Sequence, residues 1–248
     1  MSSRFSDLDF EGFKALAGDP SLSIDEKVGF PNSYRTGKEE IILRDVASKL
    51  VSLRRKGRVV LDIGSGCSGL ARSLIDLCRR RGHRLTLIDS AEMLALLPEA
   101  PGVSKVAGRF PDECRDFLAS HHGRIDAILV YSVLQYVFAE ANIFAFLDRS
   151  LELLTDGGQL LIGDIPNQSM RKRFFSSGAG IRFHQQFTGT SETPDVKHNV
   201  VEPGRIDDAV MLSVLLRARA AGFHAYLMPQ AHALPMANRR EDILIVKP

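Results

Sequence analysis

The sequence predicts an α/β protein with a seven-stranded, mostly parallel sheet, an antiparallel last strand, and helices on both faces. Two observations predict this class. From residue 57 to residue 165, short apolar runs alternate with stretches of helical periodicity, which is typical of parallel strands joined by helices. After residue 205, one helical stretch precedes two strand-like runs whose connection lacks the helix of a parallel crossover.

Each predicted element has a local signal. The first strand is a run of branched apolar residues that begins after Gly57, where the preceding helix ends. The segment Thr155-Asp156-Gly157-Gly158 predicts a turn before the fifth strand. The predicted strands are 59–63, 85–89, 104–107, 125–131, 159–165, 224–228 and 242–246. The predicted helices are 5–17, 36–55, 69–81, 91–97, 112–120, 141–154 and 207–221.

The chain divides into two predicted parts. Residues 1–56 form a helical extension that we expect to cover a cofactor or substrate, and residues 57–248 form the main domain. Within that domain, residues 166–205 are polar, rich in Gly, Ser and Thr, and poor in periodicity. A connection this long inside a compact domain is typically functional or disordered. We therefore expect a lid-like insertion there.

Composition and charge argue against several classes of protein. A formal net charge of +2 gives no reason to expect nucleic acid as a partner. No uncharged apolar run approaches the ~20 residues that span a bilayer, and residues 1–9 lack the apolar core of a signal peptide. Three cysteines without a CxxC pair favour a reducing, cytoplasmic setting. No spacing of His, Cys, Asp or Glu predicts a metal site.

The most informative segment is the glycine turn from Asp62 to Gly69, which follows the first predicted strand. Glycines let a backbone approach a ligand closely, and a carboxylate near the strand end can hold an amine or a hydroxyl. The segment also matches G-x-G-x-x-G, the dinucleotide fingerprint, and Asp89 lies where a ribose-binding acid is expected. The turn alone therefore leaves both a nicotinamide dinucleotide and S-adenosylmethionine open.

Three features favour S-adenosylmethionine. Asp62 lies where dinucleotide enzymes seldom need an acid. The chain ends in an antiparallel strand pair rather than a second catalytic domain. A reductase-type Tyr-x-x-x-Lys occurs at Tyr34–Lys38, but it precedes the glycine turn, in the wrong chain order for that family.

Four segments in order resemble the motifs of class I S-adenosylmethionine-dependent methyltransferases of the bacterial small-molecule type. They are residues 60–66, 87–94, 126–137 and 153–162. The resemblance implies a Rossmann-like fold, S-adenosyl-L-methionine as cofactor, and binding of both ribose hydroxyls by the acid of the second motif, Asp89.

Two positions depart from that family's pattern. The family often has a third glycine where this chain has Ser68, and many members have an adenine-binding acid where it has Gly108-Arg109-Phe110. Backbone atoms and the Phe110 ring are the alternative contacts for the adenine.

Candidate site residues follow from the resemblance and from the carboxyl ends of the strands, where open α/β sheets bind ligands. For the cofactor, they are Asp62, Gly64, Ser65, Gly66, Asp89, Ser90, Met93, Arg109, Phe110, Tyr131 and Ser132. For catalysis, they are Asp164, His184 and Tyr131. For substrate binding, they are Gln135, Tyr136, Arg171, Arg173 and Arg35.

The sequence thus predicts an enzyme that methylates an oxygen or nitrogen of a small polar metabolite. The basic run Arg171-Lys172-Arg173 after the fifth strand favours an anionic acceptor, such as a sugar or a nucleotide-linked sugar. The expected partner is this small molecule, with neither nucleic acid nor membrane, and a homodimer is an option. The alternatives are an NAD(P)-dependent oxidoreductase and a non-catalytic cofactor-binding protein.

Overall fold

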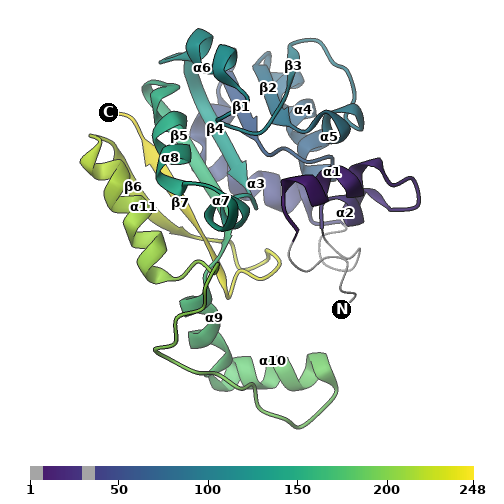
Figure 1. Ribbon diagram of the computed structural model, residues 1–248, viewed down its shortest axis with the longest axis vertical. Coiled ribbons are helices and arrows are strands. Elements are labelled where there is room, and N and C mark those ends of the chain that lie inside the picture. The colour runs from purple at the N-terminus through teal and green to yellow at the C-terminus, as the bar shows by residue number, and fades with distance from the viewer. Residues whose placement is uncertain (1–7, 30–36) are drawn as a thin grey trace.

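The computed structural model describes residues 8–29 and 37–248, which contain a seven-stranded sheet of order β3-β2-β1-β4-β5-β7-β6 (Figure 1). Strand β7 is antiparallel to its neighbours β5 and β6, and the other paired strands run parallel. The predicted mostly parallel sheet with an antiparallel last strand is therefore confirmed. The strands are β1 Val59–Ile63, β2 Arg84–Asp89, β3 Val103–Ala107, β4 Ile125–Tyr131, β5 Leu154–Pro166, β6 His224–Pro229 and β7 Arg240–Val246.

Helices cover both faces of this sheet (Figure 1). The helices are α1 Phe10–Gly18, α2 Ile24–Lys27, α3 Glu39–Lys49, α4 Gly69–Arg81, α5 Ala91–Ala95, α6 Arg115–His121, α7 Leu134–Glu140, α8 Ile143–Glu152, α9 Gln168–Phe175, α10 Gly178–Thr188 and α11 Asp208–Ala220, with a 3-10 helix, η2, at Val51–Arg54.

The core has two layers because side chains of a strand alternate between the faces of the sheet. On β1, Leu61 and Ile63 pack with α8 and α11, while Val60 packs with α3, α4 and α5. The alternation continues on β4, where Ile128 and Leu129 belong to opposite layers. Helices on both faces thus hold the carboxyl ends of β1, β2 and β4 in fixed positions.

The predicted turn at Asp156-Gly157-Gly158 lies within β5 as an irregularity of the strand. Ile125 of β4 pairs with Leu154, and Ala127 pairs with Gln159, so extra residues of β5 loop out between the two pairs. Gly157 has a φ of 72°, a conformation that favours glycine.

The structure differs from the prediction most in residues 166–205, which contain α9 and α10. These helices project from the body at one end of the molecule (Figure 1). Their apolar periodicity is weak because α9 buries no residue and α10 buries only Gly180. Their ends are set by caps instead: Asn167 accepts from two amides of α9, and Ser177 accepts from Gly180.

Four further elements differ from the prediction. Helices α2 and α7 were not predicted, since each is a short helix of two turns or less. The predicted 36–55 helix is interrupted at Leu50, which separates α3 from η2. The predicted helix at 112–120 begins later, at Arg115.

Candidate cofactor site

The glycine turn connects β1 to α4 and brings its backbone close to neighbouring side chains. Gly64 and Gly66 have φ values of 70° and 58°. A Cβ on Gly64 would lie 2.5 Å from Val133, and one on Gly66 would lie 3.0 Å from Val28. Both positions therefore favour glycine by conformation, and at Gly64 a side chain would also displace Val133.

Asp89, at the end of β2, is tied to the glycine turn by backbone hydrogen bonds. The Gly66 amide donates to Oδ2 at 2.8 Å, and the Ser90 amide donates to Oδ1 at 2.7 Å. Burial raises the pKa of Asp89, and the two amides oppose that rise in part. Each carboxylate oxygen keeps capacity for a further donor such as a hydroxyl.

Asp62 is a buried carboxylate that faces Asp89 across the turn. It is 4% exposed, and no hydrogen bond or ion pair to its side chain exists within residues 8–29 and 37–248. Burial, and then the charge of Asp89, raise the pKa of Asp62 to about 8. An unpaired buried acid is costly, so this position favours a ligand that carries a positive charge.

A cavity lies outside the carboxyl ends of β1, β2 and β4, the place where open α/β sheets bind ligands. Ten of the predicted site residues contribute to its wall: Asp62, Gly64, Ser65, Gly66, Asp89, Met93, Arg109, Phe110, Tyr131 and Ser132. Tyr136, predicted to bind substrate, also lines it. Residues far apart in the sequence thus meet in one cavity.

Helices α1 and α2 form one side of this cavity. Phe10, Phe13 and Val28 line it, and none of these was a candidate from the sequence. The Phe13 ring packs edge-on against Tyr136 with centroids 4.9 Å apart. The apolar character of these residues predicts burial, but only the tertiary structure shows against what.

Polar contacts hold α1 in place at both ends. The Phe10 amide donates to Glu140 Oε2 at 3.3 Å, and Arg109 pairs with the same oxygen at 2.8 Å. At the other end of α1, the buried Lys27 ammonium donates to the carbonyl oxygens of Leu16, Ala17 and Asp19.

Six predicted site residues do not line the cavity. Ser90 accepts from the Met93 amide at 3.2 Å and so caps α5. Gln135 Nε2 donates to the Ser132 carbonyl at 2.8 Å. Asp164 is buried behind Ser132, where it pairs with Arg240 at 2.6 Å. These three side chains therefore support the wall of the cavity rather than form it.

The other three lie on the projecting helices, away from the cavity lining. Arg171 lies over the Phe175 ring at 5.1 Å, and His184 packs edge-on against the same ring. Arg173 pairs with Asp208 of α11. Basic and aromatic side chains here stabilise α9 and α10 themselves. The last candidate, Arg35, lies outside the described residues.

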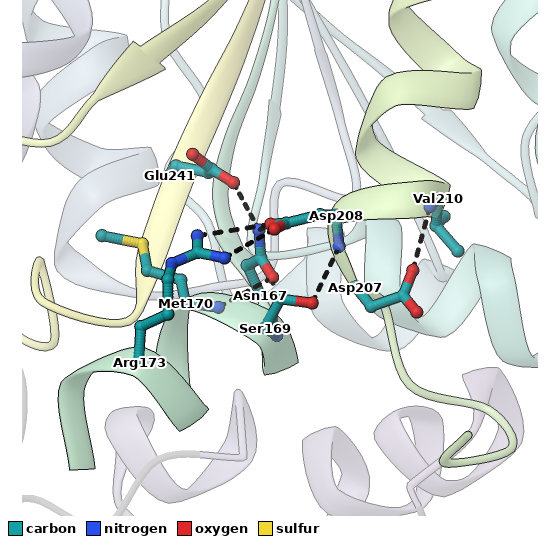
Figure 2. Close-up of polar contacts among 8 residues, drawn as sticks. All are labelled: Asn167, Ser169, Met170, Arg173, Asp207, Asp208, Val210 and Glu241. Atoms are coloured by element: carbon teal, nitrogen blue, oxygen red, sulfur yellow. Dashed lines mark hydrogen bonds and ion pairs between the residues drawn. The ribbon is translucent and has the colours of Figure 1, made fainter. Parts of the chain in front are cut away.

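Figure 2 shows how α9 is anchored to the body. Asn167 Nδ2 donates to Asp208 Oδ1 at 2.7 Å and to Glu241 of β7, while its Oδ1 accepts from the Ser169 and Met170 amides. Arg173 reaches the same Asp208 carboxylate. Arg173 thus has a structural partner, and its predicted contact with substrate stays a prediction.

Two further properties concern the described part of the chain. Residues 8–29 and 37–248 hold no group of three His, Cys, Asp or Glu side chains placed to bind a metal. Over the same residues, no helix has both the length and the apolar character that crossing a bilayer requires.

The architecture is similar to that of solved methyltransferase structures. Plantazolicin methyltransferase BamL, in complex with a triazolic desmethylPZN analog and S-adenosylhomocysteine, superposes with a TM-score of 0.59 at 14% identity over 95% of this chain and 94% of that chain. A structure from the complex of the Haloferax volcanii Trm112 methyltransferase activator with a methyltransferase superposes with a TM-score of 0.57 at 16% identity. The match covers 95% of this chain and 97% of that chain. A SAM-dependent methyltransferase from Aquifex aeolicus superposes with a TM-score of 0.52 at 14% identity, over 97% of this chain and 100% of that chain.

No protein-family model matches the sequence, and no curated protein matches it either. The likeness is therefore one of fold, and it covers nearly the whole chain. The protein has the class I SAM-dependent methyltransferase fold, which confirms the fold implied by the four sequence motifs.

Proposed function

We propose that this protein is an S-adenosylmethionine-dependent methyltransferase. The observation that carries the proposal is the pair of buried acids, Asp62 and Asp89, on either side of the glycine turn in one cavity. Within this fold, the cavity occupies the position where a nucleoside would meet the strand ends.

The residues of the cavity fit the cofactor group by group. Asp89 accepts the ribose hydroxyls, and the Asp62 carboxylate balances the ammonium of the methionine part. Gly64 and Gly66 let the turn pass close to Val133 and Val28, which line the same cavity. Met93 and Phe110 supply apolar surface for the adenine. The Phe110 ring is held by edge-on packing against Phe146, whose ring centroid lies 5.4 Å away.

The bound cofactor supplies an already activated methyl group. The chain's own residues then need to bind, orient and exclude water, and orientation alone contributes much of the rate in such a transfer. Helices α1 and α2 serve as the cover, since Phe10, Phe13 and Val28 shield the cavity from one side. Residues 166–205 serve as the lid-like insertion beside the acceptor side.

Isothermal titration calorimetry tests this proposal. We expect S-adenosylhomocysteine to bind with micromolar or tighter affinity, and NAD and NADP to give no heat of binding. Tight binding of either dinucleotide without binding of S-adenosylhomocysteine would instead identify an oxidoreductase and overturn the proposal. Incubation with methyl-labelled cofactor and a metabolite extract separates an enzyme from a non-catalytic binding protein, which transfers no label.

The proposed acceptor is a small polar, anionic molecule, such as a sugar or nucleotide-linked sugar, methylated on oxygen or nitrogen. Support comes from α9 and α10, whose residues 168–188 include four cations and no acid. Lys172 and Arg173 are paired with Glu202 and Asp208. Arg171 and Arg182 make no salt bridge within the described part of the chain and are the cations available to an anion.

A labelled-methyl assay against acceptor pools sorted by charge tests the acceptor class. Label enters the anionic pool, and the double variant Arg171→Gln and Arg182→Gln reduces this transfer. Label in neutral compounds alone contradicts the anionic acceptor without affecting the cofactor assignment.

We also propose a cytoplasmic setting, because Cys67, Cys78 and Cys114 are buried free thiols. Burial raises the pKa of Cys67 and Cys114 to about 11, so both stay protonated. The homodimer stays a prediction, which light scattering tests against the chain mass of 27.4 kDa.

A further inference from the structure

A buried polar network lies directly behind the cavity, at the ends of β4 and β5. Ser132, which lines the cavity, donates its hydroxyl proton to Asp164 Oδ2. Arg240 pairs with the same oxygen at 2.6 Å, and its Nη1 also donates to the Asp164 carbonyl at 3.1 Å. Asp164 is a catalytic candidate by sequence, but its carboxylate is engaged by these partners.

The network continues away from the cavity into the core. Gln230 Nε2 donates to Asp164 Oδ1 at 3.3 Å and to Asp242 Oδ1 at 3.0 Å. The Asp164 amide donates to Asp242 at 2.8 Å. Asp242 is fully buried, and it pairs with Lys49 of α3 at 2.7 Å. Asp164 is thus fixed from both its side chain and its backbone.

The backbone of both residues is unusual. Ser132 and Asp164 have φ values of 60° and 58°, a left-handed conformation that costs free energy for residues other than glycine. They follow the paired residues Tyr131 and Gly163, and the register of β5 against β7 shifts between Ile162 and Ile165. Such a bulge turns a side chain out of its regular direction. Here it turns Asp164 toward Ser132.

The direction of the hydrogen bond decides what Ser132 offers to a ligand. A carboxylate in an ion pair with an arginine is an acceptor only. The Ser132 proton is therefore committed to Asp164, and any further hydrogen bond at the Ser132 oxygen is one that this oxygen accepts. A serine without such a neighbour could donate or accept by rotating its hydroxyl.

We infer that Asp164 and Arg240 are a positioning pair that fixes the Ser132 hydroxyl as a hydrogen-bond acceptor at the cavity wall, so that this wall selects a ligand group bearing N–H or O–H. The inference rests on the proposed function for the identity of the nucleoside. The donor has two sources: the amino group of the cofactor, or the nucleophile of the methyl acceptor.

Three ligands with known differences separate these sources. S-adenosylhomocysteine carries the amino group, and 5′-deoxy-5′-methylthioadenosine lacks it. Sinefungin carries an additional amine at the position of the transferred methyl group. The ratio of the affinities for S-adenosylhomocysteine and 5′-deoxy-5′-methylthioadenosine reports on the amino group of the cofactor. The ratio of the affinities for sinefungin and S-adenosylhomocysteine reports on the acceptor side.

The experiment measures the three dissociation constants by calorimetry for the wild type, Ser132→Ala, Asp164→Ala, Asp164→Asn and Arg240→Met. We expect Ser132→Ala to change one ratio by about tenfold, the loss of a hydrogen bond to a charged group. Asp164→Ala and Arg240→Met change the same ratio in the same direction. Asp164→Asn restores part of it, because its amide oxygen can still accept the Ser132 proton.

The matched control is Ser150→Ala, since the Ser150 hydroxyl is fully buried and bonds to the Phe146 carbonyl within α8. It leaves both ratios unchanged. A role in stability alone lowers all three affinities together, so unchanged ratios in Ser132→Ala overturn the inference. If the wild type binds none of the three ligands, the proposed function itself is overturned.

Discussion

The acids of the cavity differ in what the protein provides for them. Asp89 receives two backbone amides, whereas Asp62 receives no partner from the described residues. The same cavity therefore contains one acid held by backbone donors and one without a partner among the described residues, and we propose that the first binds neutral hydroxyls and the second a cation. This difference gives each acid a separate experimental signature.

Replacing Asp89 by Ala removes the acceptor for the ribose hydroxyls and the link to the Gly66 amide. We expect the affinity for S-adenosylhomocysteine to fall by at least about tenfold, the effect of losing charge-assisted hydrogen bonds. Calorimetry measures the change. Asp148→Ala, which removes an exposed partner of Arg217, is the control and leaves affinity unchanged. An unchanged constant in Asp89→Ala contradicts the ribose role.

Asp62 makes the stability of the ligand-free protein depend on pH. Its folded pKa of about 8 lies above the ordinary value of 3.8, so the folded state binds the proton more tightly than the unfolded state does. The stabilisation is complete below pH ~4 and is lost as the pH rises through about 8. Urea unfolding from pH 5 to pH 9 shows this decline, and Asp62→Asn makes it shallower.

The same carboxylate gives the opposite trend for the ligand. In the proposed site the ammonium of S-adenosylhomocysteine pairs with the ionised form of Asp62, so we expect the affinity to rise as the pH approaches 8. Asp62→Asn removes this pH dependence and lowers affinity. A wild-type affinity that is flat from pH 6 to pH 8 contradicts the ammonium contact.

At the scale of elements, two groups of helices flank the strand ends and differ in their attachment. Helix α1 lines the cavity through Phe10 and Phe13, and Val28, the residue that follows α2, lines it as well. Helices α9 and α10 attach mainly through Asn167 and the residues around it (Figure 2). We propose that the first group covers the cavity and that the second acts on the acceptor.

Phe13→Ala tests the cover formed by α1. The substitution removes the aromatic contact with Tyr136 and opens the cavity wall. We expect S-adenosylhomocysteine to dissociate several-fold faster with little change in association, as measured by surface plasmon resonance. Phe183→Ala on α10 is the matched control, because Phe183 lies outside the cavity. Equal rates in Phe13→Ala and the wild type contradict the cover.

Asn167→Ala tests the anchor of α9. It removes the helix cap and the contacts with Asp208 and Glu241. Loss of a cap costs about 1 kcal/mol, so hydrogen exchange of α9 and α10 becomes faster. The affinity for S-adenosylhomocysteine stays unchanged, since the residue does not line the cavity. Faster exchange in β1 and β2 instead would mean that the effect is global.

At the scale of the whole molecule, we expect the proposed cofactor to stabilise the entire chain, because the cavity joins the N-terminal helices to three strands. At a concentration of about 100 times the dissociation constant, S-adenosylhomocysteine adds about 2.7 kcal/mol. For a protein of this size we expect the melting temperature to rise by several degrees. Differential scanning calorimetry measures the shift, and NAD at the same concentration produces none.

The sequence by itself determined the order and type of most strands, because each is a short apolar run bounded by turn residues. It also identified Asp62, Gly64, Gly66 and Asp89, since a glycine turn fixed between a strand and a helix has few conformations. The sequence did not predict helices α9 and α10, because they bury almost no side chains and are held by caps and aromatic contacts, which leave little periodic pattern.

Only the tertiary structure decided which side chains meet. Phe10 and Phe13 reach the cavity from far along the chain, and Arg173 reaches Asp208 rather than the cavity. Asp164 lies behind Ser132 because a bulge in β5 and the Arg240 guanidinium turn it there. Local pattern sets the elements, but the partners of a polar side chain depend on packing between distant segments, which no local pattern contains.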